Sequence, residues 1–220
     1  MELNLPPHGL PGLLLTVCGP DGCGKSTLEA GLLDRLASRG VTPQVLIQPS
    51  AWWREDPRVR STMVAGPRSL DPLALALFAL ADRVDQQAHE VLPVLAAGGT
   101  ILSNRYLLSL CAHFLTTREI DQALLTPLYR QLVAPDLMVV LDAPTPVLLD
   151  RVVRRDGPDP RRWDQQPEFV ARNREAFLAL ARANGALVLD TTRPAPEVLD
   201  TVWDRVAPLL PPGAPPREGR

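Results

Sequence analysis

The segment that most constrains this chain is residues 13–39, where three stretches of different character follow one another. Residues 13–18 (LLLTVC) form a short apolar run, and residues 26–39 carry apolar side chains at helical spacing before Gly40. Between them, residues 19–26 (GPDGCGKS) have the spacing Gly-x-x-x-x-Gly-Lys-Ser. In the order strand, glycine loop, helix, backbone N–H groups turn inward around a phosphate and the helix dipole adds positive charge. The sequence therefore predicts a nucleotide-phosphate site, which we call the phosphate loop.

Lysine usage points to the same loop. The chain has 23 lysine and arginine residues together, and Lys25 is the only lysine among them. An ammonium is a compact, mobile charge that reaches the outer phosphates of a nucleotide, whereas a guanidinium is a rigid fork. Ser26 is the predicted ligand of Mg²⁺. The loop residues predicted to hold ATP are Gly19, Asp21, Gly22, Cys23, Gly24, Lys25, Ser26 and Thr27.

The rest of the chain predicts one α/β domain. With 220 residues and 45% hydrophobic composition, the chain can bury a single core. Apolar runs recur, separated by helical stretches, at residues 13–18, 44–47, 100–103, 137–141 and 186–190. This alternation predicts a parallel sheet with helices on both faces and ligands at the carboxyl ends of its strands. Residues 1–12 and 208–220 are rich in proline and are expected to lack fixed structure, which leaves residues 13–207 as the domain.

Composition limits the partners and the compartment. A formal net charge of −2 gives no electrostatic reason for nonspecific nucleic-acid binding. We find no apolar run long enough for a membrane span and no secretory signal pattern, so we expect a cytoplasmic protein without a membrane partner. The three cysteines have no metal-site spacing and are expected to be reduced thiols.

A second group of motifs resembles the thymidylate kinases. Residues 103–113 (SNRYLLSLCAH) are similar to the family's third strand end, Asp-Arg-Tyr/His-x-x-Ser-x-x-Ala-Tyr-Gln. Residues 73–98 resemble its Leu-Phe-Ala-Ala-Asp-Arg helix and the following turn, and residues 168–177 resemble its Phe-x-x-Arg-Val-Arg-x-x-Tyr helix. The resemblance covers about residues 13–206.

The resemblance implies a three-layer P-loop kinase fold with a five-stranded parallel sheet and an arginine-rich lid at about residues 152–164. It implies a nucleoside-monophosphate kinase that transfers the γ-phosphoryl group of MgATP to a deoxynucleoside 5′-monophosphate, with dTMP as the leading acceptor, and a homodimer. Arg105 and Arg83 would grip the acceptor phosphate. The implied acceptor-site residues are Asp21, Phe78, Arg83, Asn104, Arg105 and Ser109; Arg151 and Thr192 join the ATP site; and the implied catalytic residues are Lys25, Arg105, Arg154, Arg155 and Arg161.

Three positions depart from the family pattern. Asn104 stands where the family has aspartate, and an amide cannot supply the negative charge that helps organise magnesium. Gln48 and the tryptophans that follow it replace the family's Glu-Pro-Gly-Gly-Thr. The family's base-stacking phenylalanine falls on Ala79, and Phe78 is one residue off, which turns a helical side chain by about 100°. Trp52 or Trp53 could replace the lost stacking surface.

Two other functions stay open at this level. One is a deoxynucleoside kinase, although it needs a carboxylate base and Gln48 is an amide. The other is a catalytically weak ATP-binding regulatory protein, which Asn104 favours and the retained Lys25 and Arg105 oppose. Asp142, after the run 137–141, is either a second magnesium ligand or a turn cap.

Overall fold

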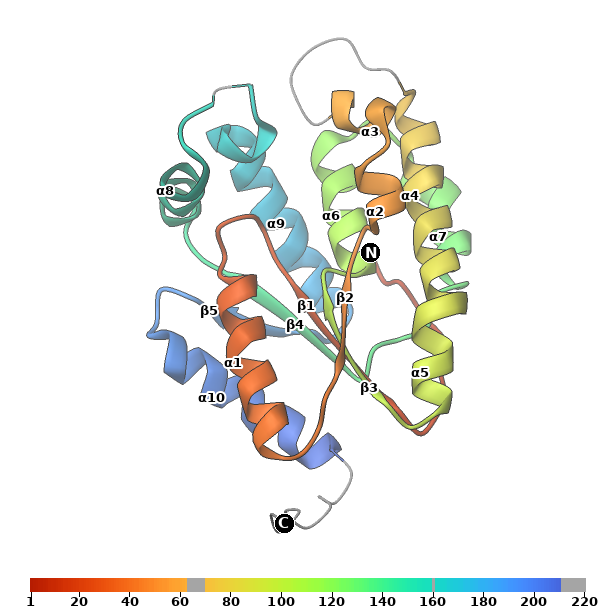
Figure 1. The fold of residues 1–220 in the computed structure, drawn as a ribbon. Coiled ribbons are helices and arrows are strands. Elements are labelled where there is room, and N and C mark those ends of the chain that lie inside the picture. The colour runs from red at the N-terminus through yellow and green to blue at the C-terminus, as the bar shows by residue number, and fades with distance from the viewer. Residues whose placement is uncertain (63–69, 160, 211–220) are drawn as a thin grey trace.

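The computed structural model describes residues 1–62, 70–159 and 161–210. Its centre is a five-stranded parallel sheet in the order β2-β3-β1-β4-β5, and Figure 1 shows helices around it. The strands are β1 (Leu13–Cys18), β2 (Gln44–Ile47), β3 (Thr100–Asn104), β4 (Leu137–Asp142) and β5 (Leu187–Asp190). The expected three-layer α/β fold is therefore confirmed, and the strand bounds agree with the apolar runs to within one residue.

The helices connect the parallel strands. They are α1 (Lys25–Ser38), α2 (Ala51–Arg54), α3 (Pro57–Thr62), α4 (Pro72–Gln86), α5 (Leu92–Ala96), α6 (Leu107–Thr117), α7 (Gln122–Tyr129), α8 (Thr145–Asp156), α9 (Pro167–Ala183) and α10 (Ala195–Val206). A π-helical turn, Gln87–Val91, joins α4 to α5 just before Pro93, which cannot donate a backbone N–H to a regular helix. Short 3₁₀ turns follow at Trp163–Gln165 and Ala207–Leu209.

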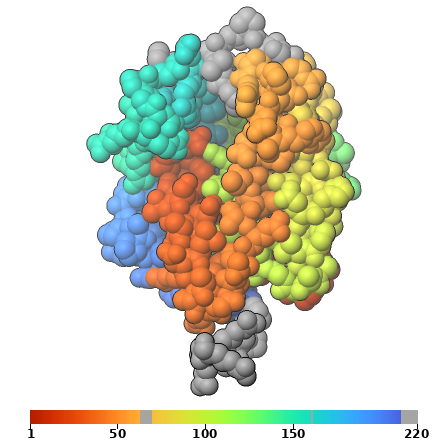
Figure 2. Space-filling view, in the orientation of Figure 1, coloured from red at the N-terminus to blue at the C-terminus, as the bar shows by residue number. Residues whose placement is uncertain are grey.

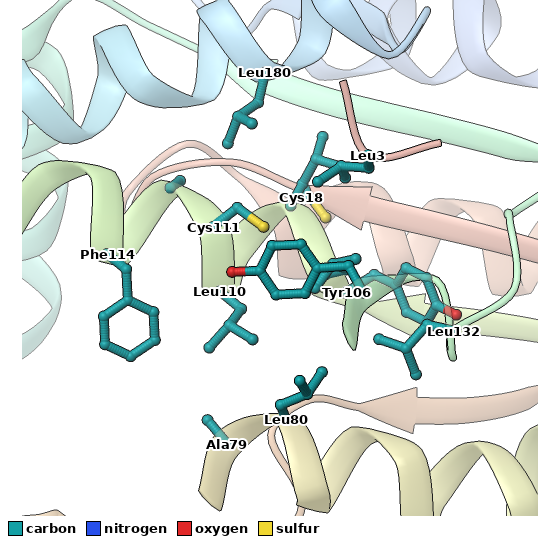
Figure 3. Close-up of a cluster of buried hydrophobic side chains, with 14 of the residues drawn as sticks. Leu3, Cys18, Ala79, Leu80, Tyr106, Leu110, Cys111, Phe114, Leu132 and Leu180 are labelled. Atoms are coloured by element: carbon teal, nitrogen blue, oxygen red, sulfur yellow. The ribbon is translucent and has the colours of Figure 1, made fainter. Parts of the chain in front are cut away.

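Two apolar cores lie on the two faces of the sheet. Along β1, Leu14 and Cys18 join one core, whereas Leu15 and Val17 join the other, as the alternation of a strand requires. The first core includes side chains of α4, α6 and α9, which Figure 3 shows converging around Tyr106. The second includes side chains of α1, α8 and α10. Each large side chain buried there contributes about 1.5–3 kcal/mol, so both cores hold the carboxyl ends of the strands in fixed positions.

The N-terminal segment differs from the expectation that residues 1–12 lack fixed structure. Leu3 is only 1% exposed, and its backbone N–H donates to Asn184 Oδ1 at 2.8 Å. Pro7 forms an isolated bridge with Ala134. The prolines and glycines suggested a loose leader, but the leucines between them bury enough apolar surface to dock it on the domain. Of the predicted C-terminal tail, residues 211–220 lie outside the described residues.

The structure contains no helix that combines the length and the apolar character needed to cross a membrane, within residues 1–62, 70–159 and 161–210.

Candidate functional site

The phosphate loop joins the carboxyl end of β1 to the first turn of α1. Gly19, Gly22 and Gly24 all have positive φ angles, of 142°, 80° and 95°. A Cβ atom on Gly19 would lie 2.4 Å from the carbonyl oxygen of Leu141, and one on Gly22 would lie 2.5 Å from that of Leu148. The loop therefore requires glycine for its backbone conformation and for its close approach to β4 and α8.

Lys25 lies within this loop and is 8% exposed. Its Nζ donates to the carbonyl oxygens of Gly19 at 3.0 Å and Pro20 at 2.8 Å. Ser26 follows it, exposed, in the first turn of α1. The described residues contain no group of three His, Cys, Asp or Glu side chains that could hold a metal ion alone. A Mg²⁺ ion held by one hydroxyl, nucleotide phosphates and water fits this donor set, because Mg²⁺ usually keeps several waters and shares substrate phosphates.

Asp21 and Arg105 form an ion pair that joins the phosphate loop to the end of β3. Burial alone would raise the pKa of Asp21, but the charges of Arg105 and Lys25 outweigh it and hold the pKa well below its usual value. Arg105 has a positive φ of 72°, and its backbone N–H donates to the carbonyl oxygen of Val17 at 2.9 Å. This uncommon backbone conformation fixes a guanidinium beside the loop.

A cavity of about 480 Å³ opens beside the phosphate loop between α1 and α10. We call it the α1–α10 cavity; its lining includes Gly24, Thr27, Leu28, Arg151, Thr191, Arg193, Pro196 and Leu199. Arg151 reaches it from α8, where Nη1 donates to Thr191 Oγ1 at 3.0 Å and to the carbonyl oxygen of Gly22 at 3.3 Å. The predicted residue Thr192 does not line this cavity, although both of its neighbours do. Sequence reasoning missed Leu28, Pro196 and Leu199, because the two helices meet only in the folded chain.

A second cavity, of about 210 Å³, lies on the other side of the loop. We call it the α4–α6 cavity; its lining is Asp21, Pro49, Trp53, Leu75, Ala79, Arg83, Arg105, Ser109, Leu110, His113 and Phe114. The structure thus brings four predicted acceptor residues together, namely Asp21, Arg83, Arg105 and Ser109. In Figure 2 the molecule is hollowed between the teal segment of α8 and the orange segment of α2 and α3, with green atoms visible inside.

Arg83 is the most deeply buried cation of this cavity, at 2% exposed. Its Nη1 donates to the carbonyl oxygen of Ala79 at 2.7 Å, and its Nε finds no partner among the described residues. Burial lowers the pKa of Arg83 to about 10. No carboxylate in the described part of the chain forms an ion pair with it. A buried guanidinium with donors to spare, lining a cavity, favours a ligand with polar acceptor atoms.

Two predicted acceptor residues lie outside the α4–α6 cavity. Phe78 instead packs edge-on against Trp52, with ring centroids 4.8 Å apart, while Ala79 lines the cavity. The physical reason is the turn of about 100° per helical residue. Trp53 lines the cavity and has a buried Nε1 without a partner among the described residues. The side chain of Asn104 contacts α1, donating to Glu29 Oε2 at 2.7 Å.

The predicted lid consists of the last turns of α8 and the segment that follows, of which residue 160 lies outside the described part. Each of its arginines is paired with a nearby acid: Arg154 with Asp150, Arg155 with Asp156, Arg161 with Asp159, and Arg162 with Asp156 and Asp164. The charge of Arg155 also helps to lower the pKa of Asp21. Among these arginines, Arg155 is therefore the one tied electrostatically to the phosphate loop.

Asp142, at the end of β4, is occupied by another partner. Both of its carboxylate oxygens accept from Arg174 of α9, each at 2.7 Å. Its backbone oxygen accepts from the N–H of Thr191 at 2.8 Å. The bidentate pair joins β4 to α9, and it engages both carboxylate oxygens of the residue for which the sequence left a magnesium-ligand and a turn-cap role open.

Comparison with known proteins agrees with this geometry. The sequence model of the family described as Thymidylate kinase matches residues 17–202. A thymidylate kinase of Deinococcus radiodurans is 35% identical over 206 residues, which are 89% of this chain and 97% of that protein. The thymidylate kinases of Cereibacter sphaeroides and Methylococcus capsulatus are 31% and 32% identical, over 92% and 91% of this chain and 97% of each relative. With the phosphate loop, the paired cavities and these matches together, the chain belongs to the thymidylate kinase family.

Proposed function

We propose that this protein transfers the γ-phosphoryl group of MgATP to dTMP, giving dTDP. Membership of the thymidylate kinase family makes it an ATP-dependent phosphotransferase. The observation that carries the proposal is the position of the phosphate loop between two cavities. Gly24 and Thr27 line the α1–α10 cavity, and Asp21 lines the α4–α6 cavity. Two nucleotides bound there would meet end to end at Lys25 and Arg105, as phosphoryl transfer requires.

On the donor side, the α1–α10 cavity offers an apolar slot for the adenine ring of ATP. Its walls come from Leu28, Pro196 and Leu199, and Arg151 lies at its edge. The phosphates would follow the backbone N–H groups of the phosphate loop to Lys25. The Mg²⁺ ion would be held by Ser26, and it neutralises charge on the outer phosphates when bound.

On the acceptor side, Arg105 lies nearest to the phosphate loop and would bind the acceptor phosphate together with Arg83. Asp21 fixes the Arg105 guanidinium through their ion pair, and Trp53 and His113 line the remaining wall. During transfer, negative charge spreads over the moving group, and Lys25 and Arg105 would stabilise it together with a lid arginine, for which Arg154, Arg155 and Arg161 are the candidates.

A deoxynucleoside kinase is not favoured, since a hydroxyl acceptor needs a carboxylate base. Asp21 is the only carboxylate among the described residues that line the α4–α6 cavity, and its pKa is held low by Arg105 and Lys25 despite its burial. Gln48 is 1% exposed and does not line that cavity. A catalytically weak regulatory protein is not favoured either, because the similar proteins are named thymidylate kinases.

A second copy of this chain is the proposed partner. Exposed apolar side chains cluster on α2, α4 and α7, and they are Trp52, Leu77, Val84, Leu124 and Leu128. A groove lined by most of them contains one charged residue, Asp85. A surface with so few charges suits an isologous contact, in which the same apolar patch of each copy is buried against the other copy. We place the dimer in the cytoplasm, where the buried free thiols of Cys18, Cys23 and Cys111 stay reduced.

Formation of dTDP from MgATP and dTMP tests the proposed function. We expect turnover by the wild-type protein and a loss of about 10²-fold or more in Lys25→Ala, because one cation at the transferring phosphates is removed. Circular dichroism and thermal unfolding would show that the variant is folded. Wild-type protein that forms no dTDP, or a Lys25→Ala variant with normal turnover, would refute the assignment.

A further inference from the structure

Asn104 lies at the carboxyl end of β3 and pairs with Val17 of β1. Val17 in turn precedes the first residue of the phosphate loop by two positions. An amide brings no charge to this position. The structure places a carboxylate against it from another element, because Asn104 Nδ2 donates to Glu29 Oε2 at 2.7 Å. The two residues are 75 positions apart in the chain, so the contact is visible only in the fold.

Glu29 lies on the same helix that begins at the phosphate loop. It follows Ser26 by three residues and Lys25 by four, and side chains at these spacings share one helix face with Cβ atoms about 5–6 Å apart. Its side chain is partly buried between α1 and β3. Glu29 therefore lies one helical turn after the residue whose hydroxyl we expect to hold Mg²⁺, on the same face of α1.

The carboxylates of Glu29 and Asp21 also differ in whether a cation is paired with them. Asp21 forms ion pairs with Arg105 and, at 3.8 Å, with Lys25, so two cations offset its charge. Glu29 accepts from a neutral amide, which orients a carboxylate without neutralising it. Beside the phosphate loop, Glu29 is thus the carboxylate whose negative charge has no ion-pair partner among the described residues.

We propose that Glu29, held by Asn104, supplies the negative charge that positions the magnesium ion at Ser26. The inference rests on the proposed function and assigns Glu29 a positioning role. Mg²⁺ keeps several water ligands in such sites, and carboxylates beyond the ion orient those ligands. The amide of Asn104 then orients the carboxylate of Glu29 on α1. The site therefore keeps a negative charge although residue 104 is not an aspartate.

A structural tie between α1 and β3 is the competing explanation, and Glu29→Gln separates the two. The substituted amide has the same shape and its oxygen still accepts from Asn104, so a structural tie is preserved and only the charge is removed. Glu90→Gln, on the π-helical turn away from both cavities, is a matched control.

The experiment is a double-mutant cycle of Glu29→Gln, Asn104→Asp and the two together, read by calorimetric binding of ADP with and without Mg²⁺. We expect Glu29→Gln to weaken Mg²⁺-dependent ADP binding by about 10–100-fold, with metal-free ADP binding unchanged. Asn104→Asp alone should also weaken it, because two carboxylates would face each other at hydrogen-bond distance. The double variant should recover most of the loss, since an amide on α1 then holds a carboxylate on β3.

Unchanged MgADP binding in Glu29→Gln would overturn the proposal, and so would a double variant no better than Asn104→Asp alone. Thermal unfolding of each variant separates loss of binding from loss of fold. Because the readout uses ADP without an acceptor, it remains valid if the wild-type protein fails to phosphorylate dTMP. That failure would count against the proposed function and not against the role of Glu29.

Discussion

Two adjacent tryptophans have different surroundings in this structure. Trp53 lines the α4–α6 cavity with a buried indole nitrogen, whereas Trp52 is 58% exposed and packs against Phe78. The sequence suggested that either of them could replace the family's stacking phenylalanine. The structure favours Trp53, because only this indole lies where an acceptor base could reach it.

Trp53→Ala is therefore expected to raise the KM for dTMP and leave the KM for ATP unchanged. Stacking of a base on an aromatic side chain contributes about 1–3 kcal/mol, which corresponds to a rise of about 5- to 150-fold. Trp52→Ala serves as the control and should change this KM by about twofold or less. Steady-state rates with dTMP varied at saturating MgATP give the first constant for each variant, and rates with MgATP varied at saturating dTMP give the second. Equal effects of the two substitutions on the KM for dTMP would exclude a base-binding role for Trp53.

At the residue level, the sequence motifs predicted where the phosphate-loop residues and Arg105 lie in the chain of elements, and their roles stay predictions. The phosphate-loop residues and Arg105 follow their strands directly, so short spacings were enough to find them. The predicted acceptor residue Phe78 lies outside the cavity. The face of α4 that lines it carries Leu75, Ala79 and Arg83, which recur every four residues, and Phe78 falls on a different face. Glu29 was missed because its importance depends on a contact with a distant strand.

At the level of elements, α8 contacts the phosphate loop through the hydrogen bond from Arg151 to Gly22 and continues into the lid. Its last turn ends at Gly157, which has a positive φ of 77°. Arg155 is paired with Asp156, and its positive charge also helps to lower the pKa of Asp21 in the phosphate loop. Arg161 is paired with Asp159 in an exposed turn. These surroundings distinguish two lid arginines that look alike in the sequence.

Arg155→Ala should lower kcat by about 10²-fold, because it removes a cation from the transferring group. The matched substitution Arg161→Ala should lower kcat only a few-fold. Both rates come from steady-state kinetics at saturating ATP and dTMP. If Arg161→Ala has the larger effect, the lid closes with a different arginine over the phosphates.

The strands were predictable because each is a short apolar run bounded by turn residues. The complete lining of the two cavities was not predictable, since each is built from elements far apart in the chain: α1 with α10, and α2 with α4 and α6. Pairing of Arg174 with Asp142 is another contact that no local pattern indicates. Sequence periodicity describes one element at a time, whereas a cavity depends on how elements pack.

At the level of the whole molecule, the exposed apolar side chains of α4 and α7 predict the oligomeric state. We expect a dimer in sedimentation experiments and a shift towards monomer in Leu128→Asp, because a buried charge is costly at an apolar interface. Leu209→Asp is the control, since this exposed leucine lies in the C-terminal 3₁₀ turn. A wild-type monomer, or the same dimer in both variants, would contradict this interface.

The docking of the N-terminal segment depends on the whole fold. The proline and glycine content of residues 1–12 predicts a segment without fixed structure, whereas the surface on which Leu3 packs forms only in the folded chain and cannot be seen in the sequence. The central β1 strand, by contrast, was predictable as a buried strand from its six apolar or β-forming residues.

The most direct test of the central claim is ADP release from MgATP by the wild-type protein with dTMP, dUMP, dCMP, dGMP and thymidine, with Lys25→Ala as the blank. We expect dTMP to give the highest kcat/KM and thymidine to give no ADP release above the blank, because Arg105 and Arg83 require a phosphate on the acceptor. Turnover of thymidine, or silence with every acceptor despite binding of MgATP, would contradict the proposed dTMP kinase.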